Sequence, residues 1–152
     1  MFVLVILLAT FSIASASSKT VFTAKLGDET GSDTDAHGTA VFVFSDDGSE
    51  LSFKLVVNGL DNVTQAHIHV APEPGGSGPV VLWLYPDAPP ATLIPGTFNG
   101  LLGSGTADSL DLTGNAGILT LDDFRLAIEE GRAYVNVHTS LFPGGEIRGE
   151  IE

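Results

Sequence analysis

Apolar and polar residues alternate along most of this chain of 152 residues. Alternation with a period of two is typical of β-strands that bury one face, and runs of Gly, Pro, Asp and Ser mark the turns between them. Residues 58–61 (Asn-Gly-Leu-Asp) are expected to form one such turn. We expect strands over residues 20–26, 39–45, 51–57, 64–70, 80–85, 98–106, 133–139 and 146–151.

One segment departs from the alternation and predicts a short helix near residues 120–130. Thr120 followed by Asp123 gives a hydroxyl N-cap with an acid three residues later, and Gly131 is placed to end the helix. Many short strands with a single helix are typical of an all-β sandwich or barrel. We favour a Greek-key β-sandwich of the superoxide-dismutase-like or immunoglobulin-like kind.

The first sixteen residues carry no charge and end in Ala14-Ser15-Ala16. An apolar run followed by small residues at this spacing is typical of a secretory signal peptide, and it is shorter than the roughly 20 residues that span a bilayer. We therefore expect a signal peptide over 1–16 and one domain over 17–152. An uncleaved membrane anchor is the alternative. Cleavage would make the protein secreted or extracellular (or periplasmic, or at the cell surface), with no membrane contact.

Charge and cysteine content exclude several classes of function. The formal net charge is −13, which disfavours nucleic acid and anionic membranes as partners and suits cation binding. The chain has no cysteine, which excludes disulfides, thiolate catalysis and cysteine-based metal sites. We find no Ser-His-Asp ordering, phosphate-binding loop or dinucleotide motif, so no catalytic residue is assigned and an enzyme is not the expected class.

Three of the four histidines carry the sharpest chemical prediction. His67 and His69 fall on one face of the strand over 64–70, and His138 falls on the polar face of the strand over 133–139. Three neutral imidazoles suit copper, zinc or nickel, so these residues are a candidate metal site, with copper first and zinc as the alternative. The other reading is that these rings lie on a half-solvated sheet face and only make hydrogen bonds.

Weaker candidates lie elsewhere in the chain. His37 is a candidate fourth ligand, and Asp33-x-Asp35 offers oxygen atoms of the kind calcium uses, without the EF-hand pattern, so a solvated loop is favoured there. Asn62-Val63-Thr64 fits a glycosylation sequon. A ladder of charge pairs is expected along the last strand, from Glu146, Arg148 and Glu150.

Several stretches resemble the CHRD domain, the module named after chordin. The resemblance runs from Gly38 to Ile151, and the C-terminal piece is the most specific. It implies a secreted module that binds or organises extracellular proteins or matrix, although nothing here matches the cysteine-rich repeats of chordin itself. The matching stretches are Ala66-His67-Ile68-His69, Gly78-Pro79-Val80-Val81, residues 133–139 and residues 143–151.

The same histidines also resemble copper–zinc superoxide dismutases, which have a His-x-His strand and a later Val-x-His strand. The likeness implies copper positions at His67, His69 and His138. The departures are the missing cysteine pair, the absent bridging histidine and zinc ligands, an Arg148 out of register, and a charge that repels an anion. We expect a non-catalytic extracellular module with a candidate copper site, and a copper-dependent redox protein as the alternative.

Overall fold

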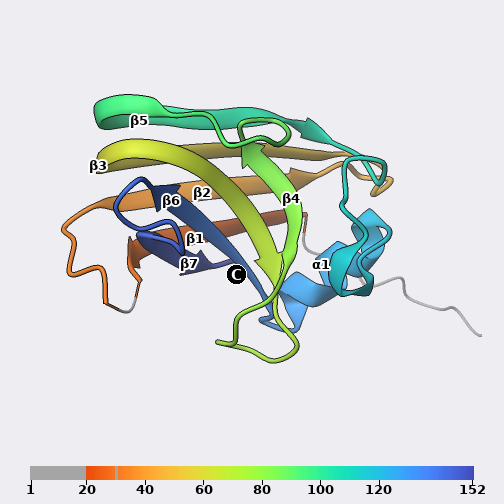
Figure 1. Cartoon of the computed structure of the whole chain (residues 1–152). Coiled ribbons are helices and arrows are strands. Elements are labelled where there is room, and N and C mark those ends of the chain that lie inside the picture. The colour runs from red at the N-terminus through yellow and green to blue at the C-terminus, as the bar shows by residue number, and fades with distance from the viewer. Residues whose placement is uncertain (1–19, 30) are drawn as a thin grey trace, which may run out of the picture.

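The computed structural model describes residues 20–29 and 31–152, so the expected signal peptide lies outside the described residues. The strands expected from alternation are present, with shifted ends, and the all-β prediction is confirmed (Figure 1). The elements in chain order are β1 (Val21–Asp28), β2 (His37–Phe44), β3 (Leu51–Val70), β4 (Val80–Tyr85), β5 (Ile94–Ala107), the 3₁₀ turn η1 (Asn115–Gly117), α1 (Leu121–Glu129), β6 (Ala133–Thr139) and β7 (Ile147–Glu150).

The seven strands form one sheet that curls back on itself. The sheet order is β2-β1-β7-β6-β3-β4, and β2 also pairs with β3, which closes β3, β2, β1, β7 and β6 into a barrel-like ring. β5 pairs with the other edge of β3. The structure therefore describes one continuous sheet, where the Greek-key sandwich prediction requires two sheets stacked face to face.

The prediction of a turn at residues 58–61 is wrong, because β3 runs without interruption for 20 residues. Its first part pairs with β2 and β5, and its last part pairs with β6 and β4. The pairing with β5 shifts register between Val57 and Leu60 and between Asp61 and Val63. The residues expected to reverse the chain, with Gly59 at φ 76°, instead form bulges that bend one strand.

The helix prediction is confirmed. The Thr120 hydroxyl accepts from the Asp123 backbone N–H, and the Asp123 carboxylate accepts from the Thr120 backbone N–H, which is a capping box. Gly131 adopts φ 70° and ends the segment. The helix buries one face, and its Phe124 ring lies 6.2 Å from that of Phe44 on β2. It thereby packs against the core at one end of the ring (Figure 1).

All seven residues of β6 are buried, whereas alternation predicts one solvated face. The second face is covered by the loop between β3 and β4 and by the loop between β6 and β7. His69 and Arg148 donate to carbonyls of the first loop, at Gly78 and Gly76, and His138 donates to the Pro143 carbonyl of the second. Both loops thus enclose a polar cluster on the outer face of the sheet.

Candidate metal centre

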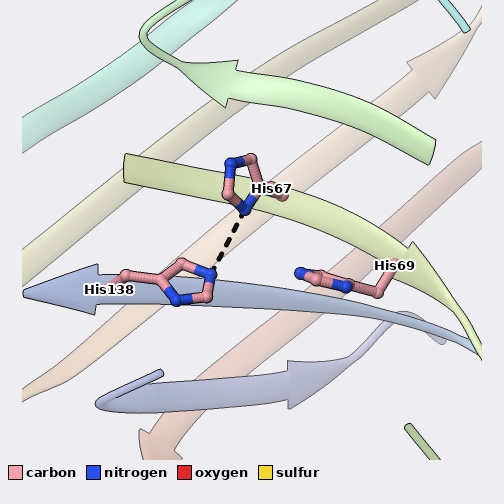
Figure 2. A group of neighbouring side chains, drawn as sticks. All are labelled: His67, His69 and His138. Carbon is pink, nitrogen blue, oxygen red and sulfur yellow. Dashed lines mark hydrogen bonds between the residues drawn. The ribbon is translucent and has the colours of Figure 1, made fainter. Parts of the chain in front are cut away.

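The three histidines singled out by the sequence lie together on this enclosed face. One nitrogen of each ring lies within 4.8 Å of the corresponding nitrogens of the other two. The Nδ1 atom of His67 is 3.2 Å from the Nε2 atom of His138. Figure 2 shows the three rings pointing toward one another from two neighbouring strands. The structure thus provides three nitrogen donors facing a common point.

Strand register explains why the rings meet. His67 and His69 are two residues apart on β3, so both point to the outer face. β6 runs antiparallel to β3, with Gln65 opposite His138 and His67 opposite Asn136. His138 is therefore the diagonal neighbour of His67 on the same face, at a separation that long side chains can cross. A slip of one residue in β6 would turn His138 into the core.

Backbone carbonyls fix the protonation of two of the rings. His69 Nδ1 lies 2.9 Å from the Gly78 carbonyl oxygen, and His138 Nδ1 lies 3.0 Å from that of Pro143. A carbonyl oxygen only accepts, so each Nδ1 carries the proton and donates it. The Nε2 atoms of His69 and His138 are then unprotonated and carry a lone pair, which is the form that binds a metal ion.

His67 completes the set from a different atom. In the metal-free protein its Nδ1–H donates to the lone pair on His138 Nε2, over the 3.2 Å contact. The Nε2 atoms of His67 and His69 are buried and have no hydrogen-bond partner. Buried polar atoms without a partner are rare and costly, so two of them in one cluster point to a ligand that the cluster is built to bind.

Burial keeps the rings neutral. His67 is 3% exposed and His138 is 6% exposed. Loss of solvent, together with the smaller effects of the neighbouring His138 and His69, lowers the pKa of His67 to about 3. Burial also lowers the pKa of His69 and of His138, although the carbonyl that accepts from each ring opposes the shift. All three imidazoles are thus neutral at neutral pH, so a metal ion would not have to displace the extra proton of an imidazolium.

Aromatic side chains support two of the rings. The Tyr134 ring stacks on His69 with centroids 5.0 Å apart and planes 7° apart. The Arg148 guanidinium carbon lies 3.4 Å from the centroid of the Tyr134 ring, on a cation–π contact. Trp83 of β4 meets His67 edge-on, with centroids 4.2 Å apart. The alternation places Tyr134 on the same face as His138, but no pattern in the sequence indicates that Arg148 or Trp83 joins the cluster.

Gly78 fixes the loop between β3 and β4 to the cluster through its backbone N–H and its backbone carbonyl. Its N–H donates to the Tyr134 hydroxyl at 3.2 Å, and its carbonyl accepts from His69. A Cβ atom at this position would stand 1.9 Å from the Val70 carbonyl oxygen, which no side chain tolerates. The Gly/Pro-rich run that the sequence marks only as a loop therefore positions His69 and Tyr134.

The weaker candidates lie outside the cluster. His37 is exposed at the start of β2, where its Nδ1 contacts the Asp35 carbonyl at 3.2 Å, so it is not a fourth ligand. In the described part of the chain, the histidine triad is the one group of three His, Asp or Glu that could hold a metal ion, so Asp33 and Asp35 form no such group. Asn62 is exposed and its side chain accepts from the Gly96 N–H, and its glycosylation stays a prediction.

The predicted charge ladder on the last strand is only partly present. Arg148 pairs with Glu150 at 2.7 Å. Glu146 is instead buried and accepts from the hydroxyls of Thr34, at 3.0 Å, and Thr139, at 2.7 Å. It precedes β7 and turns toward these neighbours, so it does not share a face with Arg148.

A family model for the CHRD domain matches residues 22–151. The chain belongs to the CHRD domain family. CHRD domains occur in extracellular or secreted proteins. No curated protein and no solved structure matches this chain, so the likeness to superoxide dismutases rests on the histidine pattern alone. Of the helices within residues 20–29 and 31–152, none has the length and apolar character needed to cross a bilayer.

Proposed function

We propose that this CHRD domain is a secreted, non-catalytic extracellular module that holds one copper ion on His67, His69 and His138. The ligand atoms would be His67 Nδ1, His69 Nε2 and His138 Nε2. The observation that carries the proposal is the cluster itself, in which three donor nitrogens lie within 4.8 Å of one another. The rings are neutral, and the Nε2 atom of His69 is buried without a hydrogen-bond partner, whereas His67 Nδ1 and His138 Nε2 hydrogen-bond to each other until an ion replaces that contact.

The distances suit a single ion with little movement. Two nitrogens that each lie about 2.0–2.1 Å from an ion and 3.2 Å from each other subtend about 100° at that ion, close to a tetrahedral angle. Ligands of one ion at this bond length lie at most about 4 Å apart, so a set within 4.8 Å needs at most about 1 Å of closure. His67 releases its Nδ1 proton and takes the Nε2 tautomer on binding.

The donor chemistry favours copper, with zinc as the alternative. The cluster offers imidazole nitrogens and neither carboxylate nor thiolate, which disfavours calcium and magnesium. Among divalent ions, affinity for nitrogen sites rises to a maximum at copper. The absence of cysteine from the chain removes the commonest structural zinc ligand.

The enclosure of the site favours holding an ion over turning over a substrate. His67 and His138 are nearly inaccessible, and loops cover the face on which they lie. A bound ion would tie β3 to β6, and binding to the folded state alone at about 1,000 times Kd would stabilise the fold by about 4 kcal/mol. The alternative, a copper-dependent redox protein, requires a reactant to reach the ion.

Copper titration with matched variants tests the proposal. Calorimetry on the metal-free protein should give one site, and His67→Ala, His69→Ala and His138→Ala should each weaken copper binding by at least about 100-fold, since each removes one of three ligands. The exposed His37→Ala is the control and should bind as the wild type does. Circular dichroism checks that each variant is folded. Unchanged affinity in folded His67→Ala and His138→Ala would remove these residues as ligands.

A further inference from the structure

Two buried oxygen atoms without a hydrogen-bond partner lie beside Gly145, in the loop between β6 and β7. They are Oε2 of Glu29, which directly follows β1, and Oδ1 of Asn136 on β6. A Cβ atom on Gly145 would stand 2.1 Å from the first oxygen and 2.4 Å from the second, so the two lie no more than about 4.5 Å apart, the sum of these distances. The order β1-β7-β6 in the sheet brings the two side chains together from distant parts of the chain (Figure 1).

The Asn136 amide presents its oxygen, and not its nitrogen, as the atom without a partner. Its Nδ2 lies 3.4 Å from the Gly144 carbonyl oxygen, which only accepts, so the nitrogen is the end of the amide that faces this carbonyl. Asn136 is 3% exposed. An amide oxygen and a carboxylate oxygen both only accept, so neither can satisfy the other. A group that brings positive charge or protons therefore belongs between them.

Three acidic residues, Asp28, Glu29 and Glu146, meet where the end of β1 contacts the start of β7. The Glu29 N–H donates to the Glu146 carbonyl at 3.0 Å, and the Ser32 hydroxyl contacts both that carbonyl and the Asp28 carboxylate. None of the three acids belongs to the ion pairs that the structure describes, which are formed by Arg125, Arg132 and Arg148. In a protein of net charge −13, a cation here would offset a local excess of negative charge.

An open polar hollow of ≈ 570 Å³ gives solvent access to Glu29. Lys25 and Arg148 also line this hollow, together with the acidic Asp28 and Glu150. The Arg148 guanidinium donates to the Gly76 carbonyl at 2.8 Å and to Glu150 at 2.7 Å. These contacts hold its charge away from the space between Glu29 and Asn136, and the hollow can supply water to an ion bound there.

We propose that Glu29 Oε2 and Asn136 Oδ1 bind a calcium ion, with water from the hollow as its other ligands. Calcium takes about six to eight oxygen ligands, and carboxylates, amide oxygens and water are all among them. Two oxygens that each lie about 2.3–2.6 Å from one ion are at most about 5 Å apart, so this pair fits without rearrangement. Neither ligand atom is a nitrogen, which disfavours copper and zinc here.

The number of protein ligands sets the strength of this site. The protein supplies two oxygens and a single negative charge, and calcium affinity falls as the charge and number of ligands fall. We therefore expect a dissociation constant on the order of 1 mM, at the weak end of the range for extracellular calcium sites.

Calcium titration of the full, metal-free chain, followed by ¹H–¹⁵N NMR at constant ionic strength, tests the site at the ligand itself. The side-chain amide signal of Asn136 should shift and saturate with a midpoint near 1 mM. Glu29→Gln keeps the shape and removes the charge, and should weaken binding by at least about ten-fold. Glu150→Gln removes the same charge from the same hollow, but from a carboxylate that Arg148 already pairs, so it is the matched control and should change affinity less than about three-fold.

The outcomes separate a calcium site from a water-filled space. Magnesium should bind at least about ten-fold more weakly, because it demands near-octahedral geometry and dehydrates reluctantly. A signal that does not move, or that moves equally with calcium, magnesium and sodium, shows that water alone fills the space and overturns the proposal. An equal response in wild type and Glu29→Gln also overturns it. Folded His138→Ala should bind calcium as the wild type does, so the result does not depend on the copper site.

Discussion

At the scale of single residues, the site depends on where each imidazole carries its proton. His69 and His138 donate from Nδ1 to backbone carbonyls, and His67 donates to His138. The alternation of the sequence predicts that these rings share a face. It does not predict that the face is buried, because the two loops that follow β3 and β6 are irregular, and alternation says nothing about how they fold back over the sheet.

Tyr134 is expected to position His69 through its ring. Tyr134→Phe keeps the stack and loses one hydrogen bond to Gly78, so it should cost about 1 kcal/mol of unfolding free energy and change copper affinity less than about three-fold. Tyr134→Ala removes the stack and leaves a cavity, and should cost about 3 kcal/mol or more and weaken copper binding further. Urea denaturation and copper titration measure both. Equal copper affinity in the two variants would show that the ring does not position His69.

Trp83 should report directly on the ion. It is the only tryptophan of the chain, and its ring lies 4.2 Å from that of His67. Binding of Cu²⁺ beside His67 should quench its fluorescence strongly, whereas Zn²⁺, which has a filled d shell and no redox chemistry, should not. Removal of copper with a chelator should restore the emission. Quenching that persists in His67→Ala and His138→Ala would place the ion elsewhere.

At the scale of elements, two loops and one long strand build the site. β3 carries two of the three proposed ligands and pairs with four other strands. The capping box of α1 and most strand positions follow from local sequence. The uninterrupted course of β3 does not follow from local sequence. Residues 58–61 are typical of a turn, but they form bulges here because partner strands on both sides hold the segment extended.

The loop between β3 and β4 should not tolerate a larger residue at Gly78, whereas the loop between β6 and β7 should tolerate one at Gly144. Gly78→Ala places a Cβ atom 1.9 Å from the Val70 carbonyl oxygen, so the loop must move, and we expect a loss of about 2 kcal/mol or more together with weaker copper binding. Gly144→Ala, in the loop that also covers the site, meets nothing within 4 Å and is the control. Thermal denaturation measures both. A neutral Gly78→Ala would contradict the tight packing of this loop.

At the scale of the whole molecule, the structure shows a barrel-like ring of strands, and the finer prediction of two stacked Greek-key sheets is not confirmed. Alternation indicates which residues face inward, but not which strands pair across long distances. The pairing of β2 with both β1 and β3, and of β6 with both β3 and β7, closes the ring. The β1–β2, β2–β3 and β6–β7 pairs join consecutive strands, but the ring closes only through β3 with β6 and β1 with β7, which lie far apart in sequence, so no stretch of sequence taken alone specifies it.

The stability of the metal-free protein should fall as pH is lowered below about 6.5. The pKa of each site histidine is lowered in the folded state, to about 3 for His67, so between these values the unfolded chain binds protons that the folded chain does not. Within this range, each histidine lowers the free energy of unfolding by up to about 1.4 kcal/mol for each unit by which the pH falls. Urea denaturation between pH 7 and pH 5, a range above the usual carboxyl pKa values, measures the slope.

The matched variants assign this slope to the cluster. His37→Ala should keep the slope, and replacing His67 should reduce it. A stability that rises as the pH falls from 7 to 5 would contradict buried, neutral imidazoles.

Pulsed electron paramagnetic resonance of the protein loaded with one Cu²⁺ per chain tests the central claim most directly, because it counts the imidazole nitrogens coupled to the ion. We predict that three imidazole rings couple to the ion in the wild type and in His37→Ala. His69→Ala should show two. A spectrum without imidazole coupling, or one that is the same in folded His67→Ala, His69→Ala and His138→Ala as in the wild type, would contradict a copper site on these three residues.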